Sequence, residues 1–383
     1  METLLFCPLS LRGVLLRNRV VVSPMLTYLA EAGLPGDEHL VHYGRFATGG
    51  AGLVFVEATK VDPRGCSTTK DLGLWSDEFI APLARIARVI QAGGAAAGIQ
   101  IAHSGRKARR SLPWEGNQPL ATCPGVAQDQ VWTLIGPSAV AHSPQCEVPI
   151  AMSAADIKAQ IEAWGAAAAR ADAAGFDVLE IQAAHGYLIH QFLSPVANQR
   201  TDGYGGSLDN RMRFAVDLVR RVRESWPATK PLFFRMSAVD DMGWTIENSV
   251  VLAALLKTHG VDVFDCSSGG IADQVTGAAP IAYGYQVPYA KRIRAGAGVM
   301  TMAVGLIIHA RQAEEILAEG SADRVAIGRE MLHNPNWAFN AAEKLGIPAP
   351  FSLLSQNAEF WLKKRSRVKG IQSSTSTGDT VPI

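Results

Sequence analysis

The side chains best suited to chemistry in this sequence follow directly on short apolar runs. Gln182 and His185 come at the end of one such run, and Tyr187 lies two residues further on. An amide and an imidazole can donate hydrogen bonds to a carbonyl oxygen, and a phenol can then supply a proton to the neighbouring carbon. Residues three apart on an extended strand face opposite sides, so this pairing requires the chain to turn. We predict Gln182 and His185 as an oxyanion pair and Tyr187 as the general acid.

A second set of residues suits a phosphate and a planar ring. Two late runs end in Gly305 and in Gly328-Arg329, which offer backbone N–H groups and a cation to a phosphate. Taken alone, Gly328-Arg329 also fits a tight surface turn. Gln100 and Arg235 close two other runs and can bind the pyrimidine edge of a flavin, with a positive charge beside the reduced ring. Together these residues predict a site for flavin mononucleotide (FMN).

These residues need a scaffold that brings the ends of many strands together. Eight short apolar runs alternate with alanine-rich stretches of helical spacing, as expected for parallel strands covered on both faces. The repeat favours an α/β fold, a single (β/α)8 TIM barrel, whose reactive groups gather at the C-terminal strand ends. A doubly wound open sheet is the alternative, but no GxGxxG follows the first run. The predicted strands are 20–23, 52–58, 96–103, 177–184, 231–237, 261–268, 299–305 and 323–329.

Three segments add to the strand–helix repeat. Residues 5–19 predict an N-terminal hairpin that turns at Arg12-Gly13 and closes the bottom of the barrel. Residues 104–150, after the third strand, are rich in proline and predict a lid over the active site, with a packing insertion as the alternative. We assign residues 1–350 to the barrel with its lid. Residues 351–383 form a C-terminal extension that we expect to be partly disordered.

The overall composition excludes several classes of partner. Lys and Arg number 36 against 35 Asp and Glu, so no excess positive charge attracts nucleic acid or an anionic membrane. No stretch is long and apolar enough for a spanning helix. The five cysteines are scattered without a CxxC pair, which argues against a metal centre and for a reducing compartment. We expect a cytoplasmic enzyme with a small-molecule substrate.

Four motifs carry a resemblance to a known family. NRVVVSPM from Asn18, GIQIAHSGRKA from Gly98, HGYLIHQFLSPVANQRTDGYGGSLDNRMRF from His185 and VAIGRE from Val325 resemble the Old Yellow Enzyme family of NADH:flavin oxidoreductases. The chain is most similar to the bacterial xenobiotic-reductase and thermophilic-like branch. The resemblance implies an FMN-dependent ene-reductase that passes hydride from NAD(P)H, through tightly bound flavin, to the β-carbon of an activated alkene with ping-pong kinetics. It also implies a homo-oligomer, either a dimer or a tetramer.

The resemblance also implies roles for individual residues. Tyr28, Gln182, His185 and Tyr187 would surround the substrate. Leu26 departs from the branch, which has cysteine there, so we expect an altered flavin potential and ligand affinity. Gln182 departs as well, because the family's pair is usually His with His or His with Asn; glutamine donates an N–H but never carries a charge. The implied FMN contacts are Ser23, Pro24, Met25, Leu26, Ala58, Gln100, Arg235, Gly305, Gly328 and Arg329.

Two other functions remain open on the sequence. One is a flavin-dependent dehydrogenase or demethylase acting on a catabolic substrate, although the larger enzymes of that kind need a cysteine cluster after the barrel that this sequence lacks. The other is a catalytically impaired flavin-binding or ligand-binding protein, against which Tyr28, His185 and Tyr187 argue. The basic stretch 360–367 (FWLKKRSR) either reaches a neighbouring subunit's pocket or ends a solvated helix.

Overall fold

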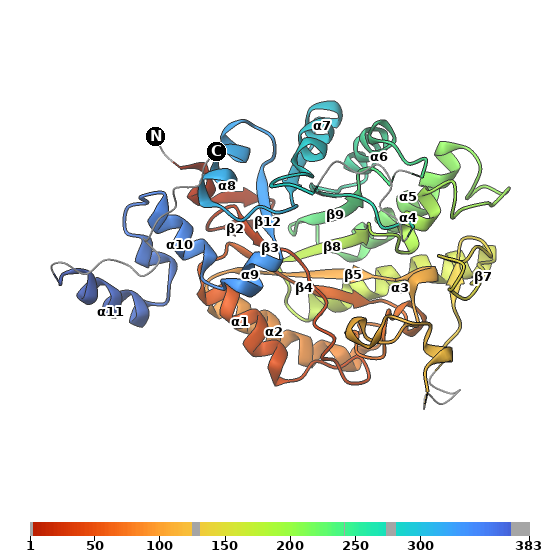
Figure 1. Ribbon diagram of the computed structural model, residues 1–383, viewed down its shortest axis with the longest axis horizontal. Helices are drawn as coiled ribbons and strands as arrows, with labels where there is room; N and C mark the ends of the chain where they lie inside the picture. The colour runs from red at the N-terminus through yellow and green to blue at the C-terminus, as the bar shows by residue number, and fades with distance from the viewer. Residues whose placement is uncertain (1–2, 125–130, 241, 273–280, 369–383) are drawn as a thin grey trace.

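The computed structural model describes residues 3–124, 131–240, 242–272 and 281–368, and at its centre eight parallel strands form a closed barrel (Figure 1). The strand order around the barrel is β10-β11-β12-β3-β4-β5-β8-β9. The TIM barrel predicted from the sequence is therefore confirmed. Its strands are β3 (Val20–Val22), β4 (Leu53–Lys60), β5 (Ala96–Ala102), β8 (Val178–Ala183), β9 (Leu232–Ser237), β10 (Val263–Ser267), β11 (Met300–Ala303) and β12 (Arg324–Ile327).

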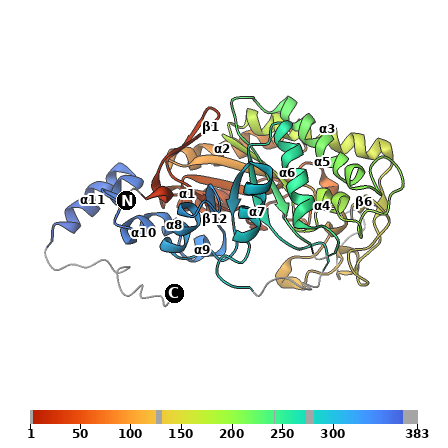
Figure 2. The ribbon, with the colours of Figure 1, turned by 90° about the horizontal axis from the view of Figure 1, so that it is seen from above.

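Helices surround the barrel, as the two perpendicular views show (Figures 1 and 2). The sequence Ser153-Ala154-Ala155-Asp156 has the pattern of a capping box, and it starts α3: Ser153 Oγ accepts from the Asp156 N–H, and the Asp156 carboxylate accepts from the Ser153 N–H. The helices are α1 (Asp37–Thr48), α2 (Ile80–Ala92), α3 (Ala154–Ala173), α4 (Leu188–Leu193), α5 (Leu208–Ser225), α6 (Ile246–Thr258), α7 (Val287–Ala297), α8 (Ala310–Ala318), α9 (Arg329–His333), α10 (Trp337–Lys344) and α11 (Gln356–Ser366).

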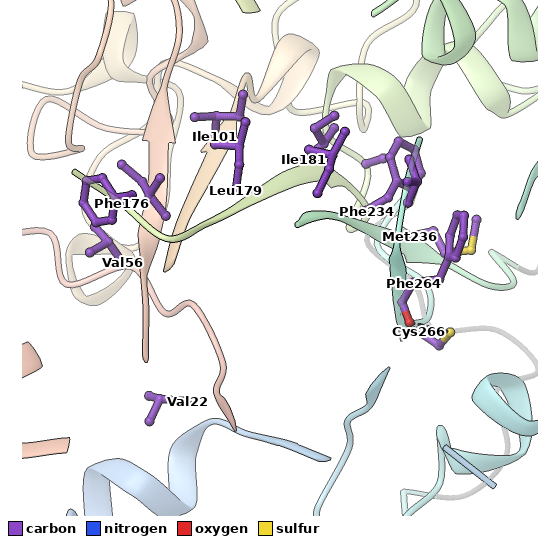
Figure 3. Packing of buried hydrophobic residues seen from close by; sticks show 14 of the residues in the cluster. Val22, Val56, Ile101, Phe176, Leu179, Ile181, Phe234, Met236, Phe264 and Cys266 are labelled. Carbon is purple, nitrogen blue, oxygen red and sulfur yellow. Dashed lines mark hydrogen bonds between the residues drawn. The ribbon is translucent and has the colours of Figure 1, made fainter. Parts of the chain in front are cut away.

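Successive residues on each strand face alternately outward and inward. Leu179 and Ile181 of β8 and Phe234 of β9 face outward and belong to the large apolar cluster between barrel and helices (Figure 3). Their neighbours Val178 and Phe233 belong instead to a smaller cluster inside the barrel. Burial on both faces explains why the strands look almost continuously apolar in the sequence.

The inward-facing residues change from apolar to polar along the barrel axis. On β8 the order is Val178, Glu180 and Gln182, and the same change occurs on the two strands beyond it. The register pairs Gln182 with Arg235 and Arg235 with Asp265, so these polar residues lie at similar heights. The barrel interior is therefore apolar toward the N-terminal strand ends and polar toward the C-terminal ends.

An N-terminal hairpin closes the apolar end of the barrel. β1 (Leu9–Leu11) and β2 (Val14–Leu16) pair antiparallel and turn at Arg12, whose φ is 48°. Leu11 and Leu16 pack into the cluster inside the barrel. The Gly13 N–H donates to the carbonyl oxygen of Thr229, just before β9, at 2.8 Å. These contacts anchor the hairpin at the N-terminal strand ends.

The excursion after β5 consists mostly of short turns. It contains the 3-10 turns η4 (Gly105–Lys107), η5 (Pro113–Glu115) and η6 (Leu120–Thr122), then β6 (Ile135–Gly136), which pairs with β7 (Ile150–Ala151). Trp114 is 68% exposed, and its ring lies edge-to-face on Tyr28 with centroids 5.6 Å apart. The excursion thus reaches a predicted substrate residue, and its role as a lid stays a prediction.

Some boundaries differ from those predicted. Arg329 was expected to close the last strand, but β12 ends at Ile327 and Arg329 is the first residue of α9. The strand ends early because Gly328, with φ −102° and ψ −101°, leaves the extended conformation. The tail predicted to be disordered, beyond Gly370, lies outside the described residues. In the part of the chain that the structure describes, no helix is long and apolar enough to span a bilayer.

Candidate functional site

A cavity of about 240 Å³ lies at the C-terminal ends of β3, β9, β10, β11 and β12. It brings together predicted residues from loops that are far apart in the sequence. Those that line it are Ser23, Pro24, Met25, His185, Arg235, Gly305, Gly328 and Arg329. The other predicted residues, which do not line it, are Leu26, Tyr28, Ala58, Gln100, Gln182 and Tyr187.

One side of this cavity combines glycine backbone with a guanidinium group. Gly305 has a φ of 108°, and a Cβ there would lie only 2.9 Å from Gln286 Oε1, so the position requires glycine. A Cβ at Gly328 would lie 3.6 Å from Met25 Sδ, which is an ordinary van der Waals contact, so lack of space does not require glycine at this position of the cavity wall. The exposed Arg329 follows directly. This combination fits the phosphate of FMN.

Arg235 provides a second cation on the cavity wall, and the buried carboxylate of Asp265 pairs with it. Its Nη1 donates to Ser23 Oγ at 3.1 Å, and its Nε lies 3.1 Å from Asp265 Oδ2. Gln100 Nε2 donates to Glu180 Oε1 at 2.7 Å in the same polar layer. Burial and the nearby Asp265 raise the pKa of Glu180, whereas Arg235 opposes this effect. Arg235 therefore presents a cation to the cavity, whereas the Gln100 amide lies in the barrel interior and binds Glu180.

The loop after β3 is fixed by a buried carboxylate on β4. Glu57 Oε2 accepts from the Thr27 N–H at 2.8 Å, and Oε1 accepts from Thr27 Oγ1 at 2.6 Å and from the Tyr43 hydroxyl at 3.0 Å. Burial raises the pKa of Glu57 to about 7. Tyr28, which follows Thr27 in the loop after β3, has a φ of 58°. Burial, followed by the nearby Tyr187, raises the pKa of Tyr28, which therefore stays a neutral phenol.

A sharp turn after β8 brings Gln182 and His185 together. His185 and Gly186 have φ values of 59° and 76°, in the left-handed region. A Cβ at Gly186 would lie 2.0 Å from the carbonyl oxygen of Gly270, so only glycine fits there. The turn places Gln182 Nε2 at 3.3 Å from His185 Nδ1. The change of direction that the pairing requires is therefore present.

Hydrogen bonds define how this pair is oriented. Gln182 Oε1 accepts from the Ala184 N–H at 3.0 Å, which leaves Nε2 to donate to His185 Nδ1. His185 Nε2 then carries the ring proton and donates to Ser267 Oγ at 2.7 Å. Desolvation, and next the positive charge of Arg235, lower the pKa of His185 well below its ordinary value. The ring is therefore a neutral hydrogen-bond donor.

Three residues of this site were missed in the sequence. Ser267 is the last residue of β10 and lies one residue before the end of the predicted strand 261–268, so the criterion that identified the other strand ends also points to this position. Lys107 belongs to a motif of the family resemblance, and its ammonium donates to the carbonyl oxygens of His185 and Gly270 at 2.9 and 3.0 Å. The ammonium group of Lys60 lies 4.9 Å from the ring centre of Tyr187. The sequence pointed to Lys60 only through its place at the end of an apolar run.

Comparisons with known proteins show which family the chain resembles. The model of the NADH:flavin oxidoreductase / NADH oxidase family matches residues 4–347. The chain is 43% identical over 352 residues to NADPH dehydrogenase of Bacillus subtilis (strain 168), covering 90% of this chain and 97% of that protein. NADPH dehydrogenase of Geobacillus sp. (strain WCH70) is 43% identical over 350 residues, covering 90% and 96%. The solved structure of morphinone reductase superposes with a TM-score of 0.74 at 26% identity, covering 91% of each chain.

These matches confirm the resemblance to Old Yellow Enzymes, including FMN as the cofactor and NAD(P)H as the electron donor. The glycine backbone and the two arginines of the cavity wall fit that cofactor. The chain therefore belongs to the NADH:flavin oxidoreductase / NADH oxidase family, as an NAD(P)H-dependent FMN oxidoreductase.

Proposed function

We propose that the chain is an ene-reductase, which reduces the carbon–carbon double bond of an enone-like or enal-like substrate. When bound, FMN accepts hydride from NAD(P)H and delivers it to the β-carbon of the alkene. The observation that carries the proposal is the position of His185. Its neutral imidazole lines the FMN cavity, beside Gln182 and two residues before the phenol of Tyr187.

The proposed cofactor contacts combine residues that line the cavity with three that do not, Leu26, Ala58 and Gln100, which the family resemblance adds. Gly305, Gly328 and Arg329 hold the phosphate, and Arg235 with Gln100 binds the pyrimidine edge. The loop after β3 lies along the ring system and contributes the apolar contacts, together with one residue of β4. These residues are Ser23, Pro24, Met25, Leu26 and Ala58.

In this proposal the substrate carbonyl oxygen replaces Ser267 Oγ as the hydrogen-bond acceptor of His185. His185 Nε2–H, now 2.7 Å from Ser267 Oγ, turns its hydrogen bond toward the carbonyl oxygen, and the Gln182 amide donates beside it. Both groups stay neutral and stabilise the negative charge that grows on the oxygen. Tyr187 supplies the proton to the α-carbon. Tyr28, a neutral phenol carried by the β3 loop, contacts the substrate.

Anaerobic half-reactions test the proposal directly. The holoenzyme is first reduced with NADPH and then mixed with 2-cyclohexenone while the flavin absorbance is followed. Fast reoxidation supports the ene-reductase. A flavin that stays reduced until oxygen enters contradicts it and favours the dehydrogenase reading. Loss of turnover with every electron acceptor would indicate the impaired binding protein.

The role of Tyr187 has its own test. We expect Tyr187→Phe to slow reoxidation by the enone by about a hundredfold, the usual contribution of a positioned general acid. The rate of flavin reduction by NADPH should not change, because that step needs no proton from Tyr187. Equal slowing of both half-reactions would show that Tyr187 is not the proton donor.

We further infer that the protein forms a homo-oligomer through its C-terminal helix. α11 packs mainly on the 3-10 turn η8 (Pro350–Leu353) and lies away from the barrel (Figures 1 and 2). Phe360 and Trp361 on this helix are 60% and 62% exposed. Light scattering during size-exclusion chromatography measures the oligomeric state, and a monomer would contradict the inference.

The cytoplasmic location, inferred from the scattered cysteines, remains a prediction.

A further inference from the structure

A fully buried ion pair lies beneath the proposed proton donor. Lys60, the last residue of β4, is 0% exposed and Asp71 is 1% exposed, with Lys60 Nζ at 3.4 Å from Asp71 Oδ2. Burial is the largest effect and lowers the pKa of Lys60, but the charge of Asp71, with smaller contributions from Tyr187, Cys66 and the hydrogen bond to Asp71, leaves the pKa raised overall. Lys60 is therefore an ammonium ion. Such a pair adds little net stability compared with an apolar pair of similar volume, so its position calls for another explanation.

The ammonium is connected to Tyr187 in two ways. It lies 4.9 Å from the centre of the Tyr187 ring. It also donates to Ser67 Oγ at 3.2 Å and to Ser104 Oγ at 3.1 Å. The two serine hydroxyls are 2.8 Å apart, and Ser67 Oγ lies 3.4 Å from the Tyr187 hydroxyl. A continuous polar path therefore joins the buried charge to the phenol oxygen.

One set of hydrogen-bond directions along this path suits a proton donor. An ammonium group donates and never accepts, so both serine oxygens act as acceptors toward Lys60. If Ser104 then donates to Ser67, the Ser67 hydroxyl proton is left to donate to the Tyr187 oxygen. With its oxygen accepting from Ser67, Tyr187 keeps its own proton for another acceptor. This is the orientation that a proton donor to substrate needs.

We propose that Lys60, held by Asp71, is a positioning residue for Tyr187, acting through Ser67 and Ser104 to orient the phenol and stabilise the phenolate that remains after proton transfer. This inference rests on the proposed function, because it assumes that Tyr187 protonates the substrate. Neither Lys60 nor Asp71 needs to touch the substrate.

The proton transfer balances with the groups present. The Tyr187 O–H bond breaks as a C–H bond forms at the substrate α-carbon, and the electron pair of the O–H bond stays on the phenolate oxygen. Ser67 donates a hydrogen bond to that oxygen, and the nearby ammonium attracts its charge. Lys60 keeps its protons throughout. Water restores the phenol proton before the next turnover.

Apart from Asp71, the titratable side chains Cys66 and Tyr28 near the pair are neutral and do not compensate the positive charge of Lys60. Burial raises the pKa of the neighbouring Cys66 thiol, so this side chain stays neutral. Burial also raises the pKa of Tyr28. Asp71 is itself engaged by Thr68, whose hydroxyl donates to Asp71 Oδ1 at 2.8 Å. Lys60 is therefore the group that can place positive charge beside a Tyr187 phenolate.

The test compares half-reactions of the holoenzyme in four forms: wild type, Lys60→Met/Asp71→Asn, Tyr187→Phe and the combination. The double substitution removes both charges at once, so no unpaired charge stays buried. We expect it to slow anaerobic reoxidation by 2-cyclohexenone roughly tenfold and to leave reduction by NADPH unchanged. The solvent isotope effect on reoxidation should increase, because proton transfer becomes the slow step. In the Tyr187→Phe background the same substitution should have no further effect.

Two additional variants complete the design. Ser67→Ala interrupts the path with the ion pair intact and should slow reoxidation in the same direction, so the inference stays testable if the double variant fails to fold. Lys70→Met is the matched control, since Lys70 lies in the same segment and pairs with Glu31 on the surface. This variant should behave as wild type.

The outcomes separate the two hypotheses. If Tyr187→Phe is slow but neutralising the pair has no effect, the positioning role fails and the proposed function stands. The positioning role is also overturned if Lys60→Met/Asp71→Asn slows reoxidation equally in the wild-type and the Tyr187→Phe backgrounds. If Tyr187→Phe reoxidises at the wild-type rate, the proton-donor assignment fails, and the present inference fails with it.

Discussion

At the scale of single residues, the site depends on neutral donors. His185 has a pKa held well below its ordinary value by desolvation and nearby cations, and Gln182 has no charge to lose. Burial also keeps Tyr28 un-ionised. Neutral donors can stabilise a growing oxyanion without competing for the proton that Tyr187 delivers. The charged side chains at the cavity wall are those of Arg235, Arg329 and Glu330.

The unusual glutamine gives a first prediction. We expect Gln182→His to raise kcat/KM for simple cyclic enones several-fold, because it restores the pair typical of the family with a second imidazole donor. Steady-state kinetics with 2-cyclohexenone measure the change, and flavin absorbance reports FMN content. Gln182→Leu is the matched control, which removes the donor and should lower activity. A large loss of turnover in Gln182→His at unchanged FMN content would contradict the prediction.

The buried Glu57 gives a prediction about pH. Its pKa is about 7 in the folded protein against an ordinary value of 4.5, so the folded state binds this proton more tightly than the unfolded state. The contribution to the free energy of unfolding is therefore greatest below pH 4.5 and is lost as pH rises to 7. The loss amounts to roughly 3 kcal/mol.

Glu57→Gln should remove this component of the pH dependence. It should also cost stability at pH 5, because an amide NH₂ replaces one of the oxygens that accept from Thr27 and Tyr43. Urea unfolding between pH 4.5 and 7.5, at fixed FMN concentration, gives both quantities. The exposed Glu31→Gln variant serves as the control. Parallel pH curves for wild type and Glu57→Gln would refute the assignment.

At the scale of elements, the ends of β11 and β12 have a separate task from the end of β8. The first two contribute Gly305, Gly328 and the exposed Arg329, whereas the turn after β8 contributes His185 and Tyr187. In the proposed function, phosphate binding and substrate activation thus belong to different strand–helix units. Variants in one unit should leave the other's task intact.

A cofactor comparison tests this division. We expect Arg329→Ala to weaken FMN binding about tenfold to a hundredfold, since a charge-assisted hydrogen bond contributes about 1.5–3 kcal/mol. Riboflavin lacks the phosphate, so its affinity should stay the same. Fluorescence titration of the apoprotein with each flavin measures the two constants. Arg311→Ala, an exposed arginine on α8, is the control, and equal weakening of both flavins would argue against a phosphate contact.

At the scale of the whole molecule, the apolar packing that stabilises the barrel and the polar residues of the cavity lie at opposite ends of the barrel. The end covered by the hairpin is apolar, with Leu11 and Leu16 packed among the inward side chains of the strands. The other end is polar and holds the cavity. A single closed barrel lets the apolar layer fix the strand register that positions the polar layer above it.

The last prediction uses this separation. Leu16→Ala should lower the free energy of unfolding by about 2–4 kcal/mol, because it leaves a cavity inside the barrel. FMN affinity and kcat should remain at wild-type values. Leu15→Ala is the matched control, since its side chain is 67% exposed and its loss should have little effect. A marked fall in FMN affinity for Leu16→Ala would show that the two ends are coupled.

The amino-acid sequence by itself determined the eight strands, the start of α3 at Ser153 and the family. These follow from periodicity, capping and long motifs, all of which are local along the chain. The cavity-wall residues also came from a local rule, because parallel strands of a barrel end at the same face.

Only the tertiary structure decided the hydrogen bond from His185 to Ser267 and the path from Lys60 to Tyr187. These partners are far apart in the sequence, and their contacts depend on strand register, on the left-handed turn at His185 and on side-chain direction. A lysine after an apolar run looks the same in the sequence whether it faces solvent or a buried carboxylate. The packing of the closed barrel determines which of the two it meets, because neighbouring strands and loops supply the partners.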